Sequence, residues 1–105
     1  MEIRRPTYFV LAALLDGPLH GYAIIKRAAE LSGGEVRLST GTLFGALDRL
    51  VDSGLVEAGE EEKVEGRVRR SYTLTHDGHV ALAAEAKSLR RAAQVVETRV
   101  RRTAT

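Results

Sequence analysis

The sequence contains no cysteine and no tryptophan among its 105 residues. Without cysteine it can form neither a disulfide nor a thiolate metal site. It also has no apolar run long enough to span a bilayer. Arg4 and Arg5 precede the apolar run 8–15 as in a secretion signal, but residues 16–18, Asp-Gly-Pro, stand where a small-residue cleavage site would be required. We therefore expect a soluble, cytoplasmic protein.

Motifs that support catalysis are also missing. The sequence has no glycine-rich phosphate loop and no nucleophile elbow, and it places no paired carboxylates at an ordered turn. His76, Asp77 and His79 come closest to a metal motif, because histidines three apart share a helix face, but the sequence offers no further ligands for them. We expect no enzymatic activity, no metal and no cofactor.

The composition is that of one small globular domain, with 44% apolar and 29% charged residues. A chain of this length buries a modest share of its surface, so a second subunit would be a natural source of stability. The formal net charge is only +2, but the charges are segregated. Five glutamates lie within residues 57–65, and arginines dominate residues 67–70 and 90–102. We expect an electrically polarised surface.

Three short helices are predicted in the first half of the chain. Apolar residues recur at helical spacing over residues 6–15, 21–31 and 40–52, and a glycine-containing stop follows each segment. Ser39 is placed to cap the third helix. Between the second and third helices, residues 36–38 alternate like a short extended segment. The second and third helices are therefore expected to be tightly linked.

A β-hairpin is predicted after the third helix. Extended structure begins at residues 55–56, and Glu65-Gly66 suits a tight turn. The return strand alternates Val68, Tyr72 and Leu74 with Arg67, Arg69, Ser71 and Thr73. This alternation predicts one packed face, interrupted by Arg70, and one basic face.

A final helix is predicted from about His76 to Arg102, with Thr75 as its cap. Its apolar residues are spaced four and three apart in turn, which is typical of a heptad seam. Such a seam favours a partner helix, so residues 76–105 are predicted to form a dimerisation helix with a basic tail. Packing against its own domain is the alternative, because the seam spans fewer than three heptads. The seam residues are Leu82, Ala86, Leu89, Ala93, Val96 and Val100.

Three helices followed by a hairpin is the element order of a winged helix-turn-helix, a mainly α fold with a small β-hairpin. We predict this fold for residues 1–75. Its third helix enters the DNA major groove, and its hairpin lies on the backbone. The first turn of the predicted third helix offers free amides and small hydroxyl groups to a phosphate or a base edge. It consists of Ser39, Thr40, Gly41 and Thr42; simple capping explains Ser39 as well.

Several motifs together resemble the PadR family of transcriptional regulators. They are His20-Gly21-Tyr22-Ala23-Ile24, Leu38-Ser39-Thr40-Gly41-Thr42-Leu43-Phe44, Ala46-Leu47-Asp48-Arg49-Leu50, Gly54-Leu55-Val56 and Tyr72-Thr73-Leu74-Thr75. The resemblance runs from about Thr7 to Gly78. It implies a homodimer that binds double-stranded operator DNA, usually as a repressor released by a small effector. The chain departs from the family at Phe44, where a tyrosine is general, and at Thr40, where proline is frequent.

The predicted DNA-contacting residues follow from the fold and the resemblance together. They are Tyr22, Ser39, Thr40, Gly41, Thr42, Phe44, Arg49, Arg67, Arg69 and Arg70. A winged-helix module that binds another protein is the alternative, because the acidic run 57–65 would repel DNA if it faced the duplex. The sequence identifies no small-molecule effector, since it has few aromatic residues and an alanine-rich final helix. A repressor without an effector therefore stays open.

Overall fold

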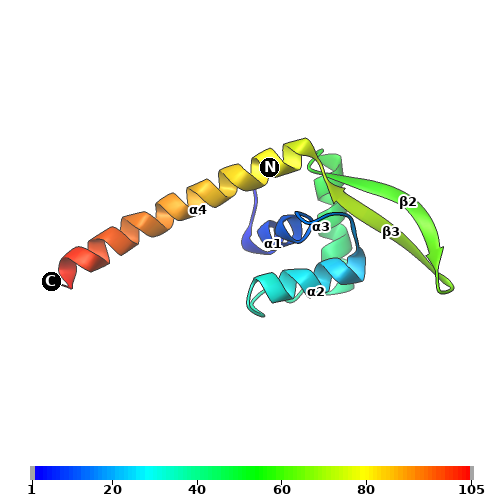
Figure 1. The fold of residues 1–105 in the computed structure, drawn as a ribbon, viewed down its shortest axis with the longest axis horizontal. Coiled ribbons are helices and arrows are strands. Elements are labelled where there is room, and N and C mark those ends of the chain that lie inside the picture. Colours follow the sequence, from blue (N-terminus) through cyan, green and yellow to red (C-terminus); the bar gives the residue numbers. More distant parts are fainter. Residues whose placement is uncertain (1, 105) are drawn as a thin grey trace.

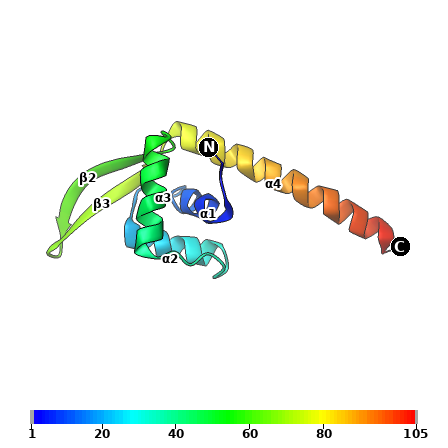
Figure 2. The same cartoon turned by 180° about the vertical axis from the view of Figure 1, so that it is seen from behind.

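The computed structural model describes residues 2–104. The elements follow one another as α1 (Arg5–Ala13), β1 (Leu19–His20), α2 (Gly21–Leu31), α3 (Thr40–Asp52), β2 (Val56–Val64), β3 (Arg67–Leu74) and α4 (His76–Thr103). The first three helices pack together, while the β2–β3 hairpin and α4 project from them in opposite directions (Figure 1). From behind, α3 stands beside α1 with its N-terminal end next to α2 (Figure 2). The predicted winged helix-turn-helix is confirmed.

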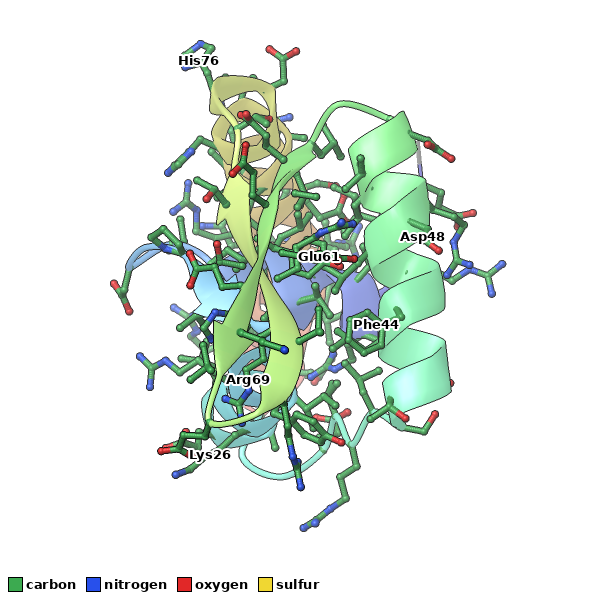
Figure 3. The ribbon with its side chains drawn as sticks, turned by 90° about the vertical axis from the view of Figure 1, so that its right-hand side faces the viewer. Lys26, Phe44, Asp48, Glu61, Arg69 and His76 are labelled. Atoms are coloured by element: carbon green, nitrogen blue, oxygen red, sulfur yellow. The ribbon has the colours of Figure 1, made fainter. Side chains whose placement is uncertain are left out.

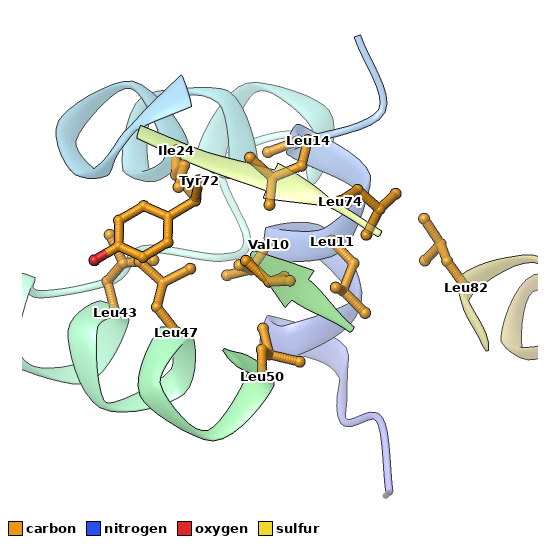
Figure 4. Close-up of a cluster of buried hydrophobic side chains, with 12 residues drawn as sticks. Val10, Leu11, Leu14, Ile24, Leu43, Leu47, Leu50, Tyr72, Leu74 and Leu82 are labelled. Atoms are coloured by element: carbon orange, nitrogen blue, oxygen red, sulfur yellow. The ribbon is translucent and has the colours of Figure 1, made fainter. Parts of the chain in front are cut away.

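The core lies where the three short helices meet the base of the hairpin (Figure 4). Leu43, Leu47 and Leu50 of α3 are fully buried, and their spacing of four and three places them on one face of the helix. Their buried neighbours are Val10, Leu11 and Leu14 from the first helical segment, Ile24 from α2, and Val56, Tyr72 and Leu74 from the hairpin. This core fixes α3 and the hairpin relative to each other.

Local signals set the ends of these elements, as the sequence predicts. Ser39 caps α3, its Oγ accepting a hydrogen bond from the Thr42 amide at 3.2 Å. Thr75 caps α4 in the same way through the Gly78 amide, at 2.9 Å. The hairpin turn at residues 65–66 has φ values of 52° and 78°. Positive φ at both central positions is the requirement of a type I′ turn, whose twist matches the paired strands.

The sheet has three antiparallel strands in the order β1-β3-β2. Strand β1 was not predicted; its two residues pair with Ser71 and Tyr72 at the base of β3. The predicted extended segment at residues 36–38 forms no strand, although Val36 is buried. On the other side of β3, the register shifts between Ala58 and Glu61 of β2. This bulge decides which charged residues of the two strands face each other.

Helix α4 packs on the domain through its first half. A Cβ on Gly78 would fall on the carbonyl oxygen of Leu55 and lie 2.6 Å from Leu74 Cδ1, so this glycine allows the helix to pack directly on the backbone. Leu82 is 6% exposed and belongs to the core of its own chain. Its assignment to an intermolecular seam is therefore corrected, and the core continues past residue 75. The exposed seam residues are Leu89, Ala93, Val96 and Val100.

Candidate nucleic-acid interface

A groove of about 260 Å³ lies between the hairpin, α3 and the N-terminal end of α2. It brings together the predicted residues Tyr22 and Phe44 and the three arginines of β3. In Figure 3, Phe44 points from α3 toward the hairpin and Arg69 lies near the hairpin tip. The full lining is His20, Gly21, Tyr22, Phe44, Glu61, Arg67, Val68, Arg69, Arg70 and Tyr72. Five of these residues were not predicted to belong to the site: His20, Gly21, Glu61, Val68 and Tyr72.

The first turn of α3 presents an exposed hydroxyl-bearing edge, as predicted. Ser39 Oγ is occupied by Thr42, because it accepts from the Thr42 amide and donates to Thr42 Oγ1 at 3.0 Å. The hydroxyl hydrogen of Thr42 is then left to donate outward. Thr40 and Gly41 are exposed beside it. In the structure, the hydroxyl of Thr42 is therefore better placed for an outside acceptor than that of Ser39.

Phe44 owes its position to a glycine on the neighbouring helix. A Cβ on Gly21 would lie 2.7 Å from Phe44 Cζ, so the bare backbone of α2 lets the ring rest on it. Phe44 and Tyr22 are both large and exposed, and both line the groove. The motif thus contributes to the site in two ways: Gly21 leaves room for the Phe44 ring, and Tyr22 lines the groove with its side chain. Arg49, also predicted, is exposed on α3 but does not line the groove.

The hairpin carries acidic and basic side chains on adjacent strands. Glu62 faces Arg69, and Glu61 faces Arg70, in the register of β2 and β3. Arg70 Nη2 lies 3.2 Å from Glu61 Oε1, with 43% and 63% of the two side chains exposed. The predicted packed face exists only at the hairpin base, where Tyr72 and Leu74 are buried, since Val68 is 63% exposed. The acidic run is thus part of the wing itself, opposite the arginines.

Tyr72 forms the floor of the groove, between α3 and the hairpin. Burial raises the pKa of the Tyr72 phenol above its ordinary value; the charge of Arg70 opposes this shift, and that of Asp48 adds to it. The phenol therefore stays protonated and can donate a hydrogen bond at neutral pH. Both Arg70 from β3 and Asp48 from α3 act electrostatically at this point of the groove.

Within residues 2–104, no helix combines the length and the apolar character that crossing a membrane would require.

Comparison with known proteins places this geometry in a family. Residues 10–84 match the family described as the transcriptional regulator PadR-like family. The transcriptional regulator Rv3488 of Mycobacterium tuberculosis is 36% identical over 87 residues, which cover 83% of this chain and 78% of that protein. An uncharacterized 37.1 kDa protein in transposon TN4556 of Streptomyces fradiae is 48% identical over 82 residues, covering 78% of this chain. The match spans only 22% of the transposon protein's length.

Solved structures share the fold. A PadR family transcription regulator from Clostridium difficile superposes with a TM-score of 0.76 at 22% identity, over 92% of this chain and 99% of that one. Bacillus subtilis PadR, whose structure was determined in complex with operator DNA, gives a TM-score of 0.69 at 25% identity. This match covers 79% of the present chain and 48% of the Bacillus chain.

Proposed function

Because the chain belongs to the PadR-like family of transcriptional regulators, we propose that it represses transcription by binding operator DNA sequence-specifically as a homodimer. The groove between α3 and the hairpin is the observation that carries this proposal. If α3 enters the major groove, one DNA backbone strand runs alongside it, where the hairpin contacts it. Tyr22, Arg67 and Arg69 line that path and supply donors suited to phosphate oxygens.

The proposed contacts divide between base edges and the backbone. Thr40 and Thr42 stand at the exposed start of α3, the part of a recognition helix that reaches base edges. Ser39 and Gly41 supply the helix N-terminus, which favours an anion such as phosphate. Phe44 offers an apolar contact of the kind that a thymine methyl accepts. The backbone contacts would come from Tyr22, Arg49, Arg67, Arg69 and Arg70.

The proposed dimer forms through residues 76–105, with the outer part of α4 as its seam. Tyr8 and Ala12 of α1, and Leu15 in the turn that follows it, line an apolar groove of about 400 Å³ with the start of α4. The exposed Leu89, Val96 and Val100 of a second copy would fill it. A two-fold dimer implies a pseudo-palindromic operator with half-sites about 10 base pairs, or a multiple of this, apart. Leu89→Glu should yield monomers in sedimentation at tens of micromolar, where the native chain should be dimeric.

The decisive experiment measures binding to the upstream region of the protein's own gene and to a random duplex of equal length. Submicromolar binding that survives competitor DNA supports the regulator. Thr42→Ala should weaken operator binding alone, by about 1 kcal/mol for one neutral hydrogen bond. Arg69→Ala should weaken binding to both duplexes. It should also lower the magnitude of the salt slope, which is the slope of log affinity against log salt concentration, by about 2 for the dimer if each arginine neutralises one phosphate.

Two results would redirect the proposal. An unchanged salt slope in Arg69→Ala would place Arg69 off the DNA. Absence of DNA binding at any salt concentration would favour a module that binds another protein through the same charged hairpin.

A further inference from the structure

One residue of the groove carries the wrong charge for a DNA interface. Glu61 lines the groove together with the arginines of β3, and its carboxylate holds Arg70 at 3.2 Å. In the described chain, Arg67 and Arg69 form no comparable ion pair, although Glu62 faces Arg69 in the strand register. Arg70 is thus the one arginine of the hairpin that is already engaged by the protein itself.

The position of Glu61 is built into the backbone. The register shift after Ala58 brings Glu61 opposite Arg70, and cross-strand partners share one face of the hairpin. Gly59, within the shift, lies so close to Ser71 that a Cβ would be 2.9 Å from the Ser71 hydroxyl oxygen. The ion pair therefore sits on the face of Tyr72, which looks toward α3 and the path of the proposed DNA backbone.

We propose that Glu61 competes with DNA phosphates for Arg70, and so holds the affinity of the protein for every duplex below what its arginines alone would give. This inference rests on the proposed DNA binding. A phosphate can take Arg70 only by displacing the Glu61 carboxylate, which is then left in a negative field.

The cost applies to operator and random DNA alike, because Arg70 meets the backbone and not a base edge. An exposed ion pair of this kind changes an equilibrium by about 3-fold per protomer, and so by about 10-fold for a dimer. Glu61 acts through Arg70 and is thus a positioning residue. By lowering the affinity for all DNA, Glu61 would let the regulator dissociate from one site and bind another.

The test compares Glu61→Gln with Glu57→Gln in the full chain. Both variants remove one exposed carboxylate from β2, but Glu57 faces Thr73 and has no arginine opposite it. The probes are a duplex selected from a random library by the native protein and a random duplex of the same length. Glu61→Gln should bind both duplexes about 10-fold more tightly than Glu57→Gln, with a salt slope steeper by about 2 per dimer. In a protein that also carries Arg70→Ala, the Glu61→Gln and Glu57→Gln variants should bind each duplex with equal affinity.

Three results would overturn the inference while leaving DNA binding intact. Equal affinities of Glu61→Gln and Glu57→Gln would make Glu61 a solvated side chain. A loss of affinity for the selected duplex alone would make Glu61 a base-reading residue. A gain that persists without Arg70 would assign the effect to general repulsion. If the native protein binds neither duplex, the proposed function itself fails. Circular dichroism of each variant checks that the fold is kept.

Discussion

The hairpin and α4 both start in the core and both extend away from it, but their outer halves expose different chemistry. The outer hairpin pairs its backbone across two strands and carries glutamates on β2 and arginines on β3, with Val68 as its exposed large apolar residue. From Leu89 onward, α4 leaves Leu89, Val96 and Val100 partly or largely exposed along one helix face. The hairpin is thus suited to a charged partner in water, whereas α4 requires an apolar partner.

The largest effect is expected at the start of α4. Gly78→Ala should lower the free energy of unfolding by about 3 kcal/mol, because the added Cβ meets the backbone of Leu55, which cannot move aside cheaply. Urea unfolding at fixed protein concentration measures this change. Gly41→Ala is the matched control, since a Cβ there meets nothing within 4 Å and alanine favours the helix. Equal stabilities of the two variants would mean that α4 is not fixed to the domain at Gly78.

A second experiment compares the two halves of α4 by the same substitution. Leu82→Ala should cost about 2 kcal/mol, the low end for a leucine that is nearly but not wholly buried. Leu89→Ala should lower the stability of the isolated protomer clearly less, because Leu89 is 47% exposed there. Urea unfolding at protein concentrations low enough to dissociate a dimer measures the free energy of unfolding of both variants as isolated protomers. A large loss in Leu89→Ala under those conditions would contradict the comparison.

The hairpin tip should respond less than the start of α4. Gly66→Ala should cost about 1 kcal/mol, because Gly66 has a φ of 78° that a residue with a Cβ adopts only with strain. Nothing lies within 4 Å of the added Cβ, so only this backbone term contributes. Urea unfolding of the Gly66→Ala and Gly78→Ala variants under the same conditions gives the ratio of their losses in the free energy of unfolding. A cost equal to that of Gly78→Ala would show that the tip is packed after all.

The smallest effect concerns the hairpin base at alkaline pH. The pKa of Tyr72 is raised by burial, so the folded state keeps its phenolic proton where the unfolded state loses it. The associated stability is complete below the unfolded pKa and is lost as pH rises through the folded one. The free energy of unfolding should therefore fall above about pH 10, and less steeply in Tyr72→Phe. Identical slopes of the two proteins would exclude Tyr72 as the source.

Features encoded by a few neighbouring residues were predictable from the sequence. The caps Ser39 and Thr75 and the Glu65-Gly66 turn depend on side chains within three residues of the backbone groups that they satisfy. The winged fold followed from the order of such elements. Several predicted interface residues also proved to line one groove, because α2, α3 and the hairpin meet there.

Features that depend on distant segments were not predictable. Strand β1 has two residues, too few to show alternation, and it exists because the base of β3 offers an open edge. The bulge that sets Glu61 against Arg70 depends on pairing across the hairpin. The heptad spacing correctly predicted a helix face at Leu82 but could not say which chain would cover it. Val68 continues the alternation of β3 beyond the point where the core ends.

Helix α4 has a mechanical consequence, because it runs without a break from the core to its far end. From Val80 to Thr103 it contains neither glycine nor proline, so no hinge is built into it. A rod of this kind is about 40 Å long at 1.5 Å per residue, and a tilt of about 5° at its base would move its far end by roughly 3 Å. In a two-fold dimer, small adjustments around Gly78 and Leu82 would thus be magnified into a changed distance between the two copies of α3. The contact of Gly78 with the carbonyl group of Leu55 is thus the point about which α4 would tilt.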